Sequence, residues 1–146
     1  MRVLIQRVSS ASVCSGGQTV GAIEQGVVAF VAFTRFDGAD QVNRLARKVA
    51  NLRIFADRQG RLQFSVLDIS GGVLTVPQFT LYANTNRGRR PDFTDALSAD
   101  DAQVLFGRFV DALGTMGIAR IESGRFGADM QVKLLNDGPL TIMLEA

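Results

Sequence analysis

The order of the hydrophobic segments is the feature that most constrains how this chain can fold. Short runs rich in Val, Ile and Phe occur in groups, and two longer stretches, 42–52 and 104–116, carry apolar residues at helical spacing. Short β-branched and aromatic runs predict strands, whereas spacings of three and four residues predict amphipathic helices. The predicted order is strands, helix, strands, helix, strands. Because the elements are grouped and do not alternate one by one, the sequence predicts an α+β fold.

The expected strands are separated largely by glycine-containing turns. Gly16–Gly17 marks one turn, and the run 73–82 is the longest candidate strand. That run contains Pro77, which has no N–H for a sheet ladder, so an edge, a bulge or a specialised site is expected there. In the segment 61–66, alternation predicts three inward side chains, Leu62, Phe64 and Val66. The other expected strands are 3–13, 18–23, 27–33, 53–56, 118–122, 128–135 and 140–144.

Both helices carry recognisable end signals. Asp37 or Asp40 is expected to cap the first helix, and Ser98 the second, with Asp101 three residues further on. Gly117 is suited to the C-terminal cap of the second helix. The expected apolar face of the first helix is Val42, Leu45, Ala46, Val49 and Leu52, and that of the second is Val104, Leu105, Phe109, Ala112, Leu113 and Met116.

Length and composition are those of one globular domain. The chain has 146 residues, 47% hydrophobic and 21% charged, which suits a single domain spanning 1–146. The net charge of +2 is too small to indicate nucleic-acid binding by itself. The N-terminus is too short and too charged for a signal peptide, and no run approaches the length of a membrane span. We therefore expect a cytoplasmic protein with no membrane association.

The chain contains no histidine and a single cysteine, Cys14. The lack of histidine excludes Ser-His-Asp and Cys-His catalysis and every histidine metal site. One cysteine excludes an internal disulfide and a cysteine-based zinc site. These two absences remove the histidine-based and cysteine-based sites for a metal.

The residues alone leave the role of two segments open. The hydroxyl of Thr80, in Gln78-Phe79-Thr80, can act as a nucleophile only with a base, and none is near in sequence. Threonine is also favoured in strands, so a structural role is the simpler interpretation. The segment 136–141 contains Asp-Gly, a strong turn signal, and by itself predicts a hairpin turn. If Gly138–Pro139 is cis, as in about 5–6% of such bonds, the flanking carbonyls point the same way.

Two further segments have competing interpretations. Arg87–Arg90 is a compact basic loop that suits phosphate, but it is equally a solvated surface loop. Phe126 and Met130 lie near Gly124 and Gly127, at the start of a predicted strand. An exposed Phe can stack on a nucleic-acid base, although such residues more often belong to the core.

Two motifs and four flanking segments occur in a characteristic order. The motifs are Pro-Gln-Phe-Thr-Leu at 77–81 and Asn-Asp-Gly-Pro-Leu-Thr at 136–141. The flanking segments are Leu4–Val13, Asn51–Phe55, Arg87–Pro91 and Gly124–Val132. Together, along nearly the whole chain, they resemble the D-aminoacyl-tRNA deacylase family.

The resemblance implies an enzyme that hydrolyses the ester between a D-amino acid and the 3′ end of tRNA, releasing free D-amino acid and tRNA. It also implies a homodimer whose domain is a three-layer β/β/α arrangement of mostly antiparallel strands with two main helices. Aminoacyl-tRNA is the implied partner, and the reaction is expected to use neither a metal nor an organic cofactor. An ester is already activated, so a placed water and an oxyanion site can suffice without histidine.

The same resemblance assigns residues to the site. Backbone groups of Gln78, Phe79 and Thr80 would build the catalytic centre, with the amide of Thr80 acting and its hydroxyl only positioning. The 2′-hydroxyl of the terminal adenosine would assist. The remaining implied substrate-binding residues are Pro77, Phe126 against the adenine, Met130 lining the pocket, Arg7 holding the Gly-Pro turn, and Asn136.

Chirality would be selected by Gly138 and Pro139. In the family, this Gly-cisPro pair reaches into the pocket of the other subunit, and its carbonyls would occupy the place of an L side chain. Specificity of this kind works by exclusion. Achiral glycine would therefore be poorly excluded, and glycyl-tRNA would also be hydrolysed.

Pro77 departs from the family motif, which has serine at this position. Proline lacks both the N–H and the hydroxyl, so any hydrogen bond of that serine is lost. A related branch of animal editing enzymes carries proline there and removes a misplaced L-amino acid. This chain keeps Phe79, where that branch has a smaller residue, so the D-specific function is preferred. The alternatives are an editing deacylase with relaxed or altered chirality and a non-catalytic tRNA-binding module.

Overall fold

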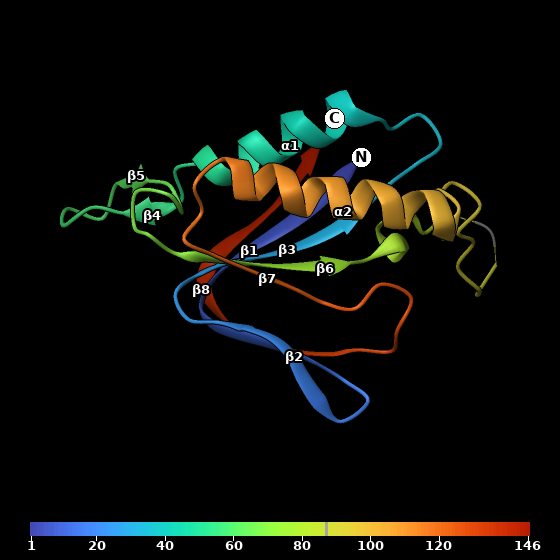
Figure 1. Cartoon of the computed structure of the whole chain (residues 1–146), viewed down its shortest axis with the longest axis horizontal. Helices are drawn as coiled ribbons and strands as arrows, with labels where there is room; N and C mark the ends of the chain where they lie inside the picture. The colour runs from blue at the N-terminus through green and yellow to red at the C-terminus, as the bar shows by residue number, and fades with distance from the viewer. Residues whose placement is uncertain (87) are drawn as a thin grey trace.

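The computed structural model describes residues 1–86 and 88–146. Two α-helices lie side by side over a six-stranded sheet, and a two-stranded sheet projects at one end (Figure 1). This arrangement confirms the predicted α+β fold with two main helices. The elements are β1 (Arg2–Ser15), β2 (Gln18–Ile23), β3 (Gly26–Ala32), α1 (Ala39–Asn51), β4 (Phe55–Ala56), β5 (Leu62–Phe64), β6 (Gly72–Pro77), the 3-10 helix η1 (Phe79–Tyr82), α2 (Ala99–Thr115), β7 (Arg120–Ser123) and β8 (Gln131–Glu145).

Strand β1 organises the sheet because it has three partners. Its first half pairs antiparallel with β3, its second half pairs antiparallel with β2, and β8 runs antiparallel along nearly its whole length. Beyond β3 the sheet becomes parallel, since β3 pairs with β6 and β6 with β7. The strands are therefore mostly antiparallel, with a parallel portion beneath α2.

Two hydrophobic cores lie on opposite faces of β3 and β6. Val27 and Val31 of β3 belong to the core beneath the helices, whereas Val28 between them belongs to the second core with Leu74 and Val76 of β6. Alternate side chains of a strand point to opposite faces, so β3 contributes to both cores. The second core is closed by β2 and the far half of β1, where the sheet curves to lie below β3 and β6 in Figure 1. The helix layer and two strand layers give the expected β/β/α order.

The helices agree with their predicted faces except at a few positions. Gly38 is the N-cap of α1, and its N–H donates to the Gln41 side chain over 3.0 Å. Asp37 does not cap the helix because its carboxylate binds the N-terminal ammonium and the amide of Thr34. Ser98 caps α2 as predicted. Val104 was expected on the buried face of α2 but is 56% exposed.

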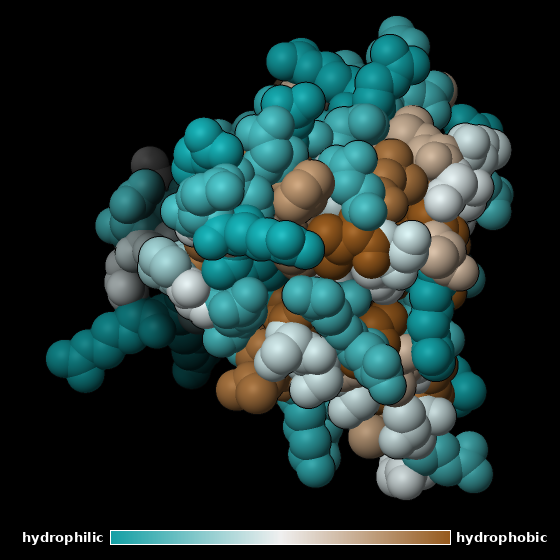
Figure 2. Space-filling view, turned by 90° about the vertical axis from the view of Figure 1, so that its left-hand side faces the viewer, coloured by the Kyte–Doolittle hydropathy of each residue, from teal (hydrophilic) through white to brown (hydrophobic). Residues whose placement is uncertain are grey.

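The small β4–β5 sheet also differs from the prediction. Val66 is buried, but Leu62 and Phe64 are 47% and 41% exposed, so the alternating pattern does not turn them inward. Phe55 of β4 is buried in the core, whereas every residue of β5 is exposed, so the ribbon packs on the molecule through β4. Figure 2, which faces the end of the molecule where β4 and β5 lie, shows apolar surface gathered among hydrophilic side chains.

The predicted hairpin at 136–139 is wrong, because β8 is one continuous strand. Its pairing with β1 shifts register so that Gln6 faces Thr141 while Val8 faces Asn136. The segment 137–140 therefore bulges out of the ladder opposite a single residue, Arg7. The long β1 offers partners on both sides of the bulge, and this outweighs the local turn signal.

Candidate functional site

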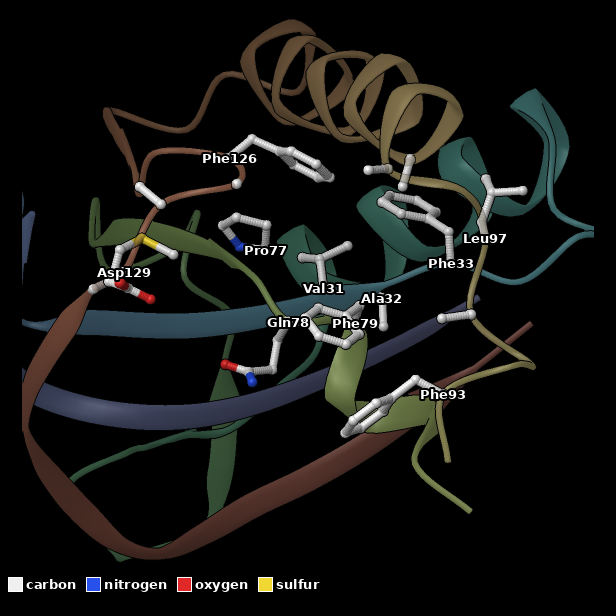
Figure 3. A pocket seen from close by; sticks show the side chains of 16 residues that line it. Val31, Ala32, Phe33, Pro77, Gln78, Phe79, Phe93, Leu97, Phe126 and Asp129 are labelled. Carbon is white, nitrogen blue, oxygen red and sulfur yellow. The ribbon is translucent and has the colours of Figure 1, made fainter. Parts of the chain in front are cut away.

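A cavity of about 480 Å³ opens where β3 and β6 end, beneath the first turns of α2 (Figure 3). The carboxyl ends of neighbouring parallel strands commonly form binding sites because the chain leaves the sheet there in different directions. The walls are mostly apolar. The lining residues are Val31, Ala32, Phe33, Pro77, Gln78, Phe79, Phe93, Ala96, Leu97, Ala99, Ala102, Phe126, Gly127, Ala128, Asp129 and Met130.

Pro77 is the residue at which the chain leaves the sheet. It pairs with Val31 of β3, whereas the pairing between β6 and β7 has already ended at Thr75. Its missing N–H therefore removes no ladder hydrogen bond, as predicted for an edge or specialised position. The next N–H, that of Gln78, donates to the Val31 carbonyl over 2.8 Å. Gln78 is thereby fixed at the floor of the cavity.

Residues 79–82 form a 3-10 helix and do not continue the strand, which corrects the prediction of a strand over 73–82. The N–H of Leu81 closes the first turn on the Gln78 carbonyl over 3.2 Å. The N–H groups of Phe79 and Thr80 come before that first bond, as the opening amides of a helix do. The Gln78 side-chain amide donates to the Thr80 hydroxyl. This bond holds the hydroxyl against Gln78.

Two aromatic rings form the outer part of the cavity. Phe79 is 55% exposed, and its ring meets Phe93 edge to face, with centroids 5.0 Å apart and planes at 73°. Such pairs add stability beyond the area they bury. Figure 3 shows both rings on the side of the cavity away from α2, opposite Phe126.

The loop between β7 and β8 supplies the opposite wall, with Phe126 and Met130. Gly124 ties this loop to the sheet, since its N–H donates to the Thr75 carbonyl over 2.8 Å. A Cβ at Gly124 would lie 2.7 Å from the Met130 sulfur and 3.5 Å from the Pro77 ring. Glycine at this position therefore allows Met130 to pack across Pro77.

The charged groups near the cavity are few. Asp129 is the one carboxylate among the lining residues named above. Burial, with a smaller contribution from the Asp37 carboxylate, raises the pKa of Tyr82 to about 12, and the Arg2 cation opposes this shift. In the described part of the chain, no three Asp, Glu or Cys side chains gather where they could hold a metal ion. No helix of that part is long and apolar enough to cross a membrane.

A second cluster surrounds the β8 bulge. Arg7 is 8% exposed, and its guanidinium donates to the carbonyls of Asp137 (3.1 Å), Gly138 (3.4 Å) and Ile54. It also pairs with the Asp137 carboxylate at 2.9 Å. The Asn136 side chain donates to the carbonyls of Arg7 and Leu140, at 2.9 and 3.2 Å. These bonds fix both ends of the bulge.

At the tip of this bulge, the Gly138–Pro139 peptide bond is cis. Both residues are exposed to solvent. Arg7 therefore donates to the carbonyls of the two residues that precede Pro139.

The structure brings only part of the predicted site together. Pro77, Gln78, Phe79, Phe126 and Met130 line one cavity, and Thr80 adjoins it through Gln78. The predicted residues that do not line the cavity are Arg7, Asn136, Gly138 and Pro139, which form the cluster at the β8 bulge.

Two aromatic residues of the cavity, Phe33 and Phe93, were not predicted from the sequence. Phe33 follows β3 and resembled a core residue, and Phe93 lies in a polar segment whose only signal is its isolated aromatic ring. In the predicted basic loop, Gly88, Arg89 and Arg90 are exposed, whereas Arg87 lies outside the described residues.

Comparison with known proteins identifies relatives over the full length of the chain. The family model described as D-Tyr-tRNA(Tyr) deacylase matches residues 4–145. A D-aminoacyl-tRNA deacylase of Halorhodospira halophila is 49% identical over 100% of this chain and 95% of its own length. One from Roseiflexus sp. is 50% identical over 100% and 94%, and one from Brevibacillus brevis is 46% identical over the whole of both chains.

Solved structures match the fold. A structure described as c-Myc DNA Unwinding Element Binding Protein superposes with a TM-score of 0.93 at 36% identity, covering 100% of this chain and 99% of that one. A probable eukaryotic D-amino acid tRNA deacylase has a TM-score of 0.85 at 18% identity, covering 98% and 97%, and supports the fold alone. Because the family model spans almost every residue and the relatives align from end to end, the chain belongs to the D-Tyr-tRNA(Tyr) deacylase family.

Proposed function

We propose that this chain hydrolyses the ester bond of D-aminoacyl-tRNA and releases the free D-amino acid and tRNA. The observation that carries the proposal is the cavity at the end of β6, where Gln78, Phe79, Phe126 and Met130 meet in a member of this family. The cavity is apolar and lined by several aromatic rings, which suits an adenosine. It lies against the opening amides of η1, which are positioned to act on the ester.

The reaction needs no side-chain nucleophile. In the proposed arrangement the adenine lies against Phe126, and the ester carbonyl oxygen accepts hydrogen bonds from the amides of Phe79 and Thr80. A water oxygen bonds to the carbonyl carbon and loses a proton, the bond from that carbon to the ribose oxygen breaks, and the ribose oxygen takes up the proton that the water lost. The neighbouring 2′-hydroxyl assists this transfer. The products are the free amino acid and the ribose hydroxyl of the tRNA. Thr80 acts through its backbone and its bond to Gln78.

Chirality is selected by a second copy of the chain. Arg7 and Asn136 hold the β8 bulge, so that Gly138 and Pro139 project from the surface with their neighbouring carbonyls fixed. None of these four residues lines the cavity of its own chain. In a homodimer they reach the cavity of the partner subunit and occupy the space that an L side chain requires. Glycyl-tRNA, with no side chain, is accepted.

Two other functions each have one supporting observation. Pro77 in place of the family serine supports an editing enzyme with altered chirality, because the changed position lines the cavity itself. The structural neighbour at 36% identity is described as a DNA unwinding element binding protein, and this supports a nucleic-acid-binding module without turnover.

The test is multiple-turnover deacylation of D-tyrosyl-, L-tyrosyl- and glycyl-tRNA by the purified protein. Release of D-Tyr and glycine with L-Tyr spared supports hydrolysis and exclusion together. Release of L-Tyr would favour altered chirality, and binding without turnover of any substrate would favour the binding module. Light scattering at the assay concentration tests the homodimer. Phe126→Ala should lower kcat/KM for D-tyrosyl-tRNA, whereas Phe64→Ala on the distant β5 ribbon serves as the control.

A further inference from the structure

A second hollow, of about 500 Å³, lies next to the cavity. It is lined by Arg2, Thr34, Arg35, Phe36, Tyr82, Ala83, Asn84, Thr85, Asn86 and Asp95. No step proposed above uses it.

The same three chain segments form the walls of both the cavity and the second hollow. Phe33 lines the cavity and Thr34 the hollow, and the 3-10 helix likewise runs from Phe79 in the cavity to Tyr82 in the hollow. Asp95 lines the hollow and the next residue lines the cavity. The segments are also tied together, since the Thr34 hydroxyl donates to the Asp95 carbonyl over 2.8 Å. A long ligand bound in the cavity can therefore extend into the hollow.

Phe36 presents an exposed aromatic ring at this hollow. It is 81% exposed, more than any other large hydrophobic residue of the described chain. The Arg35 guanidinium lies 5.7 Å from the centre of the ring. The turn that carries both is held in place, because Asp37 accepts from the Thr34 amide over 2.7 Å and donates its own N–H to the Thr34 carbonyl over 3.1 Å. Phe36 thus contributes little to the core, although hydrogen bonds hold the turn that carries it in place.

The polar groups around Phe36 are those that bind nucleotides. Asn84 and Asn86 bring side-chain amides, which both donate and accept hydrogen bonds. Asn84 also pairs with Asp92 in an isolated bridge, so the loop that carries Arg89 and Arg90 starts at the rim of the hollow. Arg35 meets Asp95 only at 3.8 Å, and both side chains are 61% exposed. An exposed ion pair of this kind is weak, so Arg35 remains available for a phosphate.

We propose that this hollow binds the single-stranded nucleotides that immediately precede the terminal adenosine of tRNA. One base stacks on Phe36, Arg35 contacts a phosphate, and the two asparagines contact base edges. The inference rests on the proposed function, because it places the adenosine in the neighbouring cavity. It explains why an exposed ring, a cation and two amides gather beside an apolar pocket.

The test compares two substrates that differ only in these nucleotides, D-tyrosyl-tRNA and D-tyrosyl-adenosine. Loss of stacking on one aromatic ring costs about 1–3 kcal/mol, so Phe36→Ala should lower kcat/KM for the tRNA about tenfold more than for the adenosine ester. Arg35→Gln should also lower the ratio of kcat/KM for the tRNA to kcat/KM for the adenosine ester, and it should reduce the salt dependence of that ratio. Phe64→Ala, which removes an exposed ring from β5, should leave the ratio unchanged.

Each other outcome has a distinct meaning. If Phe36→Ala lowers kcat/KM equally for both substrates, or for neither, the hollow does not bind the preceding nucleotides. Hydrolysis by the unmodified protein would still stand. If light scattering shows that Phe36→Ala changes the oligomeric state, the ring belongs to a contact between copies and the inference is wrong. If the unmodified protein hydrolyses neither substrate, the proposed function itself fails.

Discussion

Replacement of Arg7 by methionine should lower the free energy of unfolding by about 2–4 kcal/mol. The guanidinium donates to three carbonyls, those of Ile54, Asp137 and Gly138, and a hydrogen bond to a charged group contributes about 1.5–3 kcal/mol. Asp137 and Gly138 are exposed, so water can replace Arg7 at their carbonyls. Ile54 is buried, and its unpaired carbonyl accounts for most of the loss. The exposed partner Asp137 makes the ion pair a minor contribution.

The assay is urea unfolding at one fixed protein concentration, because oligomers gain apparent stability with concentration. Arg7→Lys keeps the positive charge but not the planar guanidinium, so its loss in free energy of unfolding should be smaller than that of Arg7→Met. Arg108→Met, on the exposed face of α2, is the matched control and should change stability by less than about 0.5 kcal/mol. A loss below about 1 kcal/mol for Arg7→Met would refute the claim that Arg7 is needed to satisfy the buried carbonyl of Ile54.

Three other predictions follow from the same contacts. Thr80→Ala should retain measurable deacylation, because nothing near Thr80 can activate its hydroxyl; complete loss in a folded, tRNA-binding protein would make the hydroxyl a nucleophile. Arg89→Ala combined with Arg90→Ala should weaken tRNA binding and reduce the slope of log K against log salt by up to about 2, and an unchanged slope would remove this loop from the RNA contact. Because the pKa of Tyr82 is raised to about 12, its contribution to stability should be complete below about pH 10 and lost as the pH rises further. Tyr82→Phe should therefore reduce the alkaline decline seen in urea unfolding, and an identical decline would assign it to other groups.

The elements that repeat a period over many residues were predictable from the sequence. The face of α1 from Val42 to Val49 is buried as the spacing indicated, and the strand 18–23 has the predicted limits. End positions were less predictable, because they depend on contacts with other segments. Asp37 is a residue type that commonly caps helices. Here its carboxylate binds the N-terminal ammonium instead, which is distant in sequence.

Local sequence signals predicted the wrong structure where a long partner strand was available for pairing. Asn-Asp-Gly-Pro predicts a turn in isolation, and such a turn would separate two short strands. The fourteen residues of β1 pair on both sides of this motif, so that a continuous β8 satisfies more backbone groups than a hairpin would. Similarly, Thr80 has strand propensity, but the pairing of β6 with β3 ends at Pro77, and residues 79–82 form a 3-10 helix.

The candidate site divides in the same way between short-range and long-range information. The motif at 77–81 and the segment containing Phe126 could be identified because each is contiguous. Phe33 and Phe93 could not, since they acquire a role only when β3 and the segment before α2 meet at the end of β6. Phe36 was also missed, because a lone Phe in a loop has no period. The exposure of Phe36 indicates a binding role only because the ring lies at the hollow. The residues proposed to bind the tRNA end are therefore brought together by the fold and not by the local sequence.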